Sequence, residues 1–167
     1  MLSRLLPRQL DNTYQGYTLA LWLLVPIVMV KFLMGVNVAG LNPWVSNRDV
    51  LRTVDGIPLD TFGADAASTV VFLFASWGLG LLLLSVLGIA ALLRYRAMIP
   101  LMYLMLAIEQ IGRMELSRLN SIARAVGPGG VSPGTVINWG LAAALVIGLV
   151  LSLAAPRKGA SERRELS

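Results

Sequence analysis

The residues most able to do chemistry lie in one segment of mixed character. Residues 106–118, LAIEQIGRMELSR, follow an apolar stretch and carry five polar or charged side chains: Glu109, Gln110, Arg113, Glu115 and Arg118. Glu109 and Arg113 are four residues apart, so they share one face of a helix. A carboxylate within an apolar helix is costly unless it is paired or protonated. The segment therefore predicts a partner for Glu109 close by.

Lys31 is the other charged residue within an apolar stretch, near the end of the first hydrophobic segment. If consecutive helices run up and down, the ends of the first and third helices lie on one side at similar depth. We therefore predict a cluster of Lys31, Glu109 and Arg113, which Gln110 could join. Two interpretations stay open. Lys31 could extend to the membrane surface while Glu109 pairs with Arg113 alone, or the cluster could bind a lipid headgroup, a quinone or a small anion.

The composition is that of a membrane protein. The 167 residues are 56% hydrophobic, the mean hydropathy is +0.72, and only 14% of residues are charged, against about 25% in ordinary soluble domains. Long apolar stretches leave no room for a large soluble domain. The net charge of +5 is concentrated at the ends of these stretches, where it sets topology and gives no sign of a nucleic-acid partner.

The sequence offers no catalytic signature. Cys and His are both absent, which removes thiol chemistry, the commonest general base and the commonest metal ligand. We find no Gly-rich phosphate loop, nucleophile elbow or metal-ligand set. We therefore predict a protein without enzymatic activity, metal site or cofactor.

Hydrophobic periodicity divides the chain into three parts. Residues 1–16 form an amphipathic lead, 17–155 a single transmembrane domain, and 156–167 a charged tail. The expected helices span residues 17–36, 67–93, 97–126 and 135–155, with an external loop at 37–66. Within that loop, Ser46 or Asn47 is expected to cap a short helix, and DGIP at 55–58 to form a turn.

The distribution of Lys and Arg predicts the orientation. With both termini inside, eight basic residues lie in the cytoplasm: Arg4, Arg8, Arg94, Arg96, Arg157, Lys158, Arg163 and Arg164. Five lie outside: Arg48, Arg52, Arg113, Arg118 and Arg124. The expected fold is an all-α, polytopic, four-helix transmembrane bundle with both termini cytoplasmic.

Two stripes of small residues predict close helix packing. The fourth segment carries Gly140, Ala144, Gly148 and Ser152 at intervals of four, and the second carries Gly80 and Gly88 on a similar stripe. Small residues at this spacing let helix backbones approach one another in a membrane. We predict that these two helices pack together. The alternative is a face for another subunit, including a second copy of this chain.

The layout resembles the DoxX-like four-helix bacterial membrane proteins across residues 17–155. The shared features are a first helix ending in a lysine (VMVKFLMG), a polar external loop, a Gly- and Leu-rich second helix and a short basic turn (RYRAMIP). The extension EQIGRMELSRLNSIAR departs from that pattern. The resemblance implies a bundle in the bacterial inner membrane and assigns no catalytic residue.

The function predicted first is binding of a lipidic ligand or a partner subunit. The site would lie on the extracytoplasmic side and include Lys31, Glu109, Gln110 and Arg113. The alternative is a small proton-coupled transporter or permease component in which Glu109 titrates. A transporter needs polar residues continuing toward the cytoplasm, and the sequence supplies few, which favours the one-sided binding site.

Overall fold

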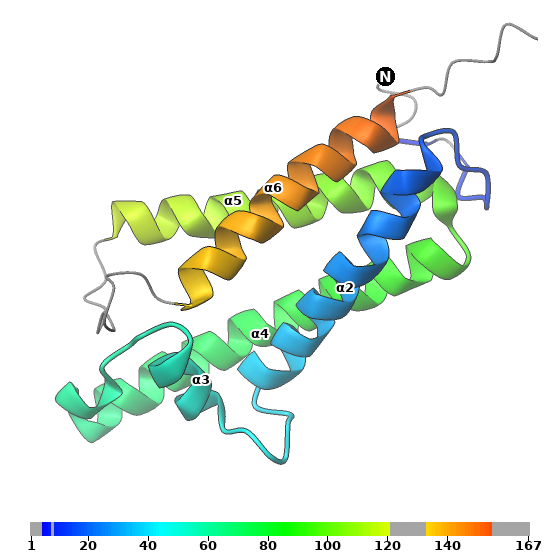
Figure 1. Ribbon diagram of the computed structural model, residues 1–167. Helices are drawn as coiled ribbons and strands as arrows, with labels where there is room; N and C mark the ends of the chain where they lie inside the picture. Colours follow the sequence, from blue (N-terminus) through cyan, green and yellow to red (C-terminus); the bar gives the residue numbers. More distant parts are fainter. Residues whose placement is uncertain (1–4, 8, 121–132, 155–167) are drawn as a thin grey trace, which may run out of the picture.

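The computed structural model describes residues 5–7, 9–120 and 133–154, which form helices and connecting turns and contain no strand (Figure 1). The elements in chain order are α2 (Thr18–Val38), α3 (Asn47–Thr53), the 3-10 helix η1 (Leu59–Thr61), α4 (Ala64–Leu93), the 3-10 helix η2 (Arg96–Met98), α5 (Ile99–Leu119) and α6 (Pro133–Leu153). Three helices, α2, α4 and α6, are long and apolar enough to cross a membrane. The fourth long helix, α5, is not among them, because Glu109, Arg113, Glu115 and Arg118 interrupt its apolar character.

The third long helix ends earlier than the predicted residue 126. α5 stops at Leu119, and Asn120 leaves the helix with φ −105° and ψ 90°. The Asn120 side-chain amide donates to the Leu116 carbonyl oxygen at 2.9 Å, a local bond of the kind by which asparagine competes with the helical ladder. The rest of the predicted stretch, 121–126, lies outside the described residues, as do the whole tail, 156–167, and residues 1–4 and 8 of the lead.

The loop predicted at residues 37–66 contains the predicted short helix. Ser46 is the N-cap of α3, and its hydroxyl accepts a hydrogen bond from the Arg48 amide at 3.2 Å. Gly56 has φ +70°, a conformation that the DGIP turn can adopt because glycine has no Cβ. An ion pair between Arg52 and Asp60 connects α3 to η1.

The long helices run alternately up and down (Figure 1). At one end of the bundle, the Tyr17 amide donates to the Leu151 carbonyl at 3.2 Å, and the Ala97 amide donates to the Asp11 carbonyl at 3.3 Å. The start of α2, the turn between α4 and α5, and the end of α6 therefore lie together. α3 lies at the opposite end, where a Cβ on Gly134 would be 2.8 Å from the Val54 carbonyl oxygen.

The apolar core occupies the half of the bundle next to the α4–α5 turn. It is built from the first half of α2, the end of α4, the first half of α5 and the middle of α6, with these buried members: Ala20, Leu24, Ile27, Val28, Ala91, Ile99, Met102, Tyr103, Leu106, Ala107, Leu141 and Leu145. The Tyr103 hydroxyl donates to the Ala20 carbonyl oxygen at 2.6 Å, which satisfies the one polar atom of this large buried side chain.

The two stripes of small residues face different neighbours, so the predicted pairing of the second and fourth segments is wrong. Gly88 of α4 faces Val28 of α2, and Gly148 of α6 faces the ring of Tyr103 of α5. Apart from atoms of the same stretch of helix, no heavy atom of the described residues lies within 4 Å of a Cβ placed on Gly80 or Gly140. Spacing marks a face of a helix, but it does not identify the helix which that face meets.

The remaining members of the α6 stripe, Ala144 and Ser152, also belong to the interior. Ala144 packs partly buried against the core, and the buried Ser152 hydroxyl donates to the Leu149 carbonyl at 2.8 Å. α4 comes closest to α2 at two other glycines, Gly35 of α2 and Gly78 of α4. A Cβ on Gly35 would lie 2.9 Å from the Leu82 nitrogen, so the two backbones are in contact there.

Gly148→Leu should destabilise the protein strongly, because the added side chain would occupy the position of the Tyr103 ring, which is fixed by its bond to Ala20. Overpacking of this kind costs about 1–3 kcal/mol or more. Gly140→Leu is the matched control on the same helix and should change the free energy of unfolding by less than about 0.5 kcal/mol. Unfolding in mixed detergent micelles measures the change in the free energy of unfolding for both variants. Equal effects of the two variants would contradict this packing.

Candidate functional site

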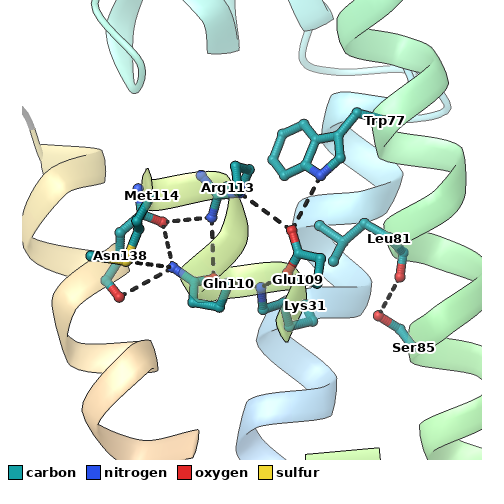
Figure 2. Close-up of polar contacts among 9 residues, drawn as sticks. All are labelled: Lys31, Trp77, Leu81, Ser85, Glu109, Gln110, Arg113, Met114 and Asn138. Carbon is teal, nitrogen blue, oxygen red and sulfur yellow. Dashed lines mark hydrogen bonds and ion pairs between the residues drawn. The ribbon is translucent and has the colours of Figure 1, made fainter. Parts of the chain in front are cut away.

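A polar cluster lies beyond the apolar core, in the half of the bundle that carries α3. Every long helix contributes to it: Lys31 from α2, Trp77 from α4, Glu109, Gln110 and Arg113 from α5, and Asn138 from α6 (Figure 2). The structure thus brings together the four residues predicted as a site and adds two others. We call these six residues the polar cluster.

Lys31 is the buried centre of this cluster. Its side chain has 0% exposure, and its ammonium group donates to Glu109 Oε2 and, at 2.5 Å, to Gln110 Oε1. The lysine therefore points into the bundle instead of extending to the membrane surface. A buried ammonium group needs such partners, since the cost of removing it from water is otherwise several kcal/mol.

Glu109 connects three helices through one carboxylate (Figure 2). Oε2 accepts from Lys31 of α2, while Oε1 accepts from Trp77 Nε1 of α4 at 3.2 Å and from Arg113 Nε at 3.3 Å. The guanidinium of Arg113 also lies 4.8 Å from the centre of the Trp77 ring, within the range of a cation–π contact. The predicted pairing of Glu109 with Arg113 is present, and it is one of several bonds to this carboxylate.

Gln110 and Asn138 extend the cluster to α6. Gln110 Nε2 donates to the Asn138 backbone oxygen and to its Oδ1, both at 3.1 Å. Arg113 Nη2 donates to Gln110 Oε1 at 3.1 Å and to Asn138 Oδ1 at 2.9 Å. Among the described residues, no buried side-chain nitrogen or oxygen lacks a hydrogen-bond partner.

Two members of the cluster were not predicted as site residues. Neither Trp77 nor Asn138 carries a charge, so neither was singled out among the residues that could do chemistry. The signal for Asn138 is its position near the start of the fourth segment, on the side where the first and third helices end. Trp77 gives no comparable signal, because its contact with Glu109 depends on how α4 crosses the bundle.

A cavity of about 330 Å³ adjoins the cluster and lies next to α3. Arg113, Asn138 and Trp77 belong to its wall, together with Asn37 of α2. Most of the rest is apolar, with these residues from α2, the α3 region and α6: Val30, Met34, Val38, Val45, Val50, Val54 and Ile137. The cavity therefore combines an apolar wall with a small set of polar groups, which is the usual character of a small-molecule site.

A second cavity, of about 360 Å³, lies at the opposite end, between the segment before α2 and the start of α5. Asp11 and Tyr14 are among its lining residues. Hydrogen bonds from Thr13 hold the pKa of the Asp11 carboxyl below its usual value. Burial raises the pKa of Tyr14 to about 12, so its hydroxyl stays protonated as a donor to the Tyr17 carbonyl at 3.1 Å. These bonds engage the Asp11 carboxyl and the Tyr14 hydroxyl with groups of the same segment.

Fold and cavity together define a class: a helical protein with membrane-length helices and a buried polar cluster beside a mostly apolar cavity. No protein-family model, curated protein or solved structure matches the chain. The resemblance to DoxX-like proteins stays a prediction. The described residues contain no group of three or more Asp or Glu side chains placed to hold a metal ion.

The Lys31–Glu109 pair can be tested by a double-mutant cycle. Glu109→Gln alone leaves the Lys31 ammonium buried without its carboxylate, and breaking a buried pair in this way costs about 3–5 kcal/mol. Lys31→Met alone should be milder, because Arg113 and Trp77 still bind Glu109. The double variant should be more stable than the sum predicts, with a coupling of about 0.5–3 kcal/mol.

The control for this cycle is Glu115→Gln on the same helix. Glu115 pairs with Arg118 at 3.7 Å, and both side chains are largely exposed, so the change should cost less than about 1 kcal/mol. Additive effects of Lys31→Met and Glu109→Gln would show that the two groups do not interact in the membrane.

Proposed function

We propose that the protein is a non-enzymatic integral membrane protein that spans the inner membrane four times, with both termini in the cytoplasm. The end of the bundle that carries the α4–α5 turn has Arg94 and Arg96, and the predicted topology assigns eight basic residues of the sequence to this side. An excess of Lys and Arg favours the cytoplasmic side. The α3 end would then face the extracytoplasmic side.

We propose that α5 is the fourth span despite its charges. Its first half is buried, including Tyr103 and Leu106, and Glu109 and Arg113 bond to partners on α2, α4 and α6. Ionisable residues within membrane helices face the bundle interior and pair there. α5 has this arrangement, and its more exposed Glu115 and Arg118 lie further toward the end of the helix.

The function that the geometry supports best is the binding of a small lipidic molecule in the cavity beside the polar cluster. The observation that supports this function is a cavity of about 330 Å³ that combines an apolar wall with convergent polar groups from α2, α5 and α6. Small-molecule cavities occupy about 300–1,000 Å³, so this one suits a small ligand or part of a lipid.

A proton-coupled transporter is the alternative, and the polar groups give it less support. Toward the other end of the bundle, the buried Ser85 hydroxyl donates to the Leu81 carbonyl at 2.8 Å, and the Tyr103 hydroxyl donates to Ala20. Both hydroxyls serve the backbone of the helices, so they do not continue the chain of bonds that surrounds Glu109. Glu109-dependent proton flux into reconstituted vesicles would reverse this preference.

The orientation can be tested with single-cysteine variants, because the native sequence contains no cysteine. Trp44→Cys, at a side chain with 89% exposure on the α3 side, should react with a membrane-impermeant maleimide in intact cells. Ser161→Cys in the tail should react only after permeabilisation. The reverse pattern, or labelling of both positions from outside, would contradict the proposed topology.

Ligand binding can be tested by native mass spectrometry of the protein extracted gently from its own membrane. Val54→Trp, which fills the cavity from the α3 side, should remove a stoichiometric small-molecule adduct. Val136→Trp is the control, because Val136 lies beside the cavity residue Ile137 but is itself 65% exposed. A protein without an adduct, or an adduct equally retained by both variants, would contradict binding in this cavity.

A further inference from the structure

We infer that the cavity binds a single-chain amphiphile with an anionic headgroup, a phosphate or a carboxylate, held by Arg113 and Asn138. This inference rests on the proposed function and specifies its ligand. It depends on two features of the polar cluster, its uncompensated charge and the hydrogen-bond donors that the cluster leaves over.

The cluster carries more positive than negative charge. Lys31 and Arg113 share the single carboxylate of Glu109, so the formal charge is +1. Among the described residues, the acidic residue in the cavity wall is Asp55, and it already takes part in another interaction. A net charge at membrane depth is expensive unless a counter-charge accompanies it. An anion beside Arg113 would supply that counter-charge.

The hydrogen bonds within the cluster use its acceptor atoms and leave some of its donor groups without an acceptor. Both Arg113 Nη2 and Gln110 Nε2 donate to Asn138 Oδ1, which fixes the orientation of the Asn138 amide. Among the described residues, Asn138 Nδ2 and Arg113 Nη1 then have no hydrogen-bond partner. Both side chains line the cavity. Two donors of this kind, one of them charged, match a phosphate or carboxylate oxygen.

A second amide in the cavity wall, that of Asn37, has the same character. Asn37 Oδ1 accepts a hydrogen bond from Asn42 Nδ2 at 2.6 Å, so its acceptor is in use on the side of the loop. Asn37 lies on α2, whereas Asn138 lies on α6, and both line the cavity. Polar groups from two helices could therefore contact one headgroup.

The rest of the wall suits a hydrocarbon chain. Val30, Met34 and Ile137 line the cavity, and Val30 and Ile137 are 39% and 46% exposed at the bundle surface. A chain anchored by its headgroup can therefore continue along these residues toward the surrounding lipid. The volume of about 330 Å³ is near the lower limit of ligand cavities, about 300 Å³, so it favours one chain over two.

The test compares three ligands with the same dodecyl chain and different heads: dodecyl phosphate, dodecylphosphocholine and dodecyl maltoside. Inorganic phosphate alone is the fourth ligand. Binding to the full-length protein in nanodiscs of neutral lipid is followed by isothermal titration calorimetry. Dodecyl phosphate should bind at least about tenfold more tightly than each of the others, a difference of about 1.4 kcal/mol. The preference should weaken as salt rises.

The variants assign the preference to Arg113. Arg113→Gln should reduce the affinity for dodecyl phosphate to that for dodecyl maltoside, while Arg113→Lys should retain part of the preference through its charge. Arg48→Gln is the control, because Arg48 is exposed on α3, at the same end of the bundle, and lies outside the cavity wall. If Arg113→Gln does not fold, the ligand series on the native protein still tests the preference for an anionic headgroup.

Four outcomes would contradict either this inference or the proposed function, and they can be told apart. Equal affinity for all three dodecyl ligands, abolished by Val54→Trp, would overturn the anionic headgroup and leave the proposed function standing. Tighter binding of dodecylphosphocholine would also overturn it and would point to a zwitterionic headgroup. Inorganic phosphate binding as tightly as dodecyl phosphate would overturn the role of the chain. No binding of any dodecyl ligand would contradict the proposed function itself.

Discussion

The fold depends on one carboxylate, that of Glu109, which is shared by Lys31, Arg113 and Trp77. A lysine with no exposed surface in an apolar bundle is tolerable only if an opposite charge meets it there. The carboxylate meets this requirement and at the same time connects α2, α4 and α5. Gln110 and Asn138 complete the connection to α6. The relative positions of the four long helices at this level are therefore set by the demands of hydrogen bonding and charge pairing.

This constraint divides the bundle into layers along its length. Next to the α4–α5 turn, apolar side chains and the small residues Gly88 and Gly148 allow close packing. At the polar cluster, directional bonds are added to the close contact of α2 and α4 at Gly35 and Gly78. Beyond it, the α4 and α5 ribbons separate toward the end that carries α3 (Figure 1), and the cavity lies in that part of the bundle. The cavity thus borders Arg113, which shares the single carboxylate of Glu109 with Lys31.

The centre of the site was predictable from the sequence because it depends only on the depth of the charged residues along their helices and on helical spacing. Lys31 and Glu109 interrupt apolar segments that end on the same side, and Arg113 is one turn from Glu109. The short helix α3 was predictable from Ser46, since capping is a local property. Features that depend on the angles between helices were not predictable in this way. Trp77 meets Glu109, and Gly148 meets Tyr103, only because of how the helices cross. The end of α5 at Leu119 was missed because the helical pattern of the sequence continues past it, whereas Asn120 leaves the helix with its side-chain amide bonded to the Leu116 carbonyl oxygen.

The most direct test of the central claim is whether the Lys31 ammonium contacts the Glu109 carboxylate in a lipid bilayer. The chain has only two lysines, Lys31 and Lys158, so Lys158→Arg leaves a single lysine side chain to label with ¹⁵N. Solid-state NMR can then measure the dipolar coupling between this nitrogen and ¹³C-labelled glutamate carboxyl carbons, with Glu109→Gln identifying the partner. The account predicts a strong coupling that disappears in Glu109→Gln. A lysine nitrogen that shows no carboxyl coupling and exchanges freely with bulk water would contradict it.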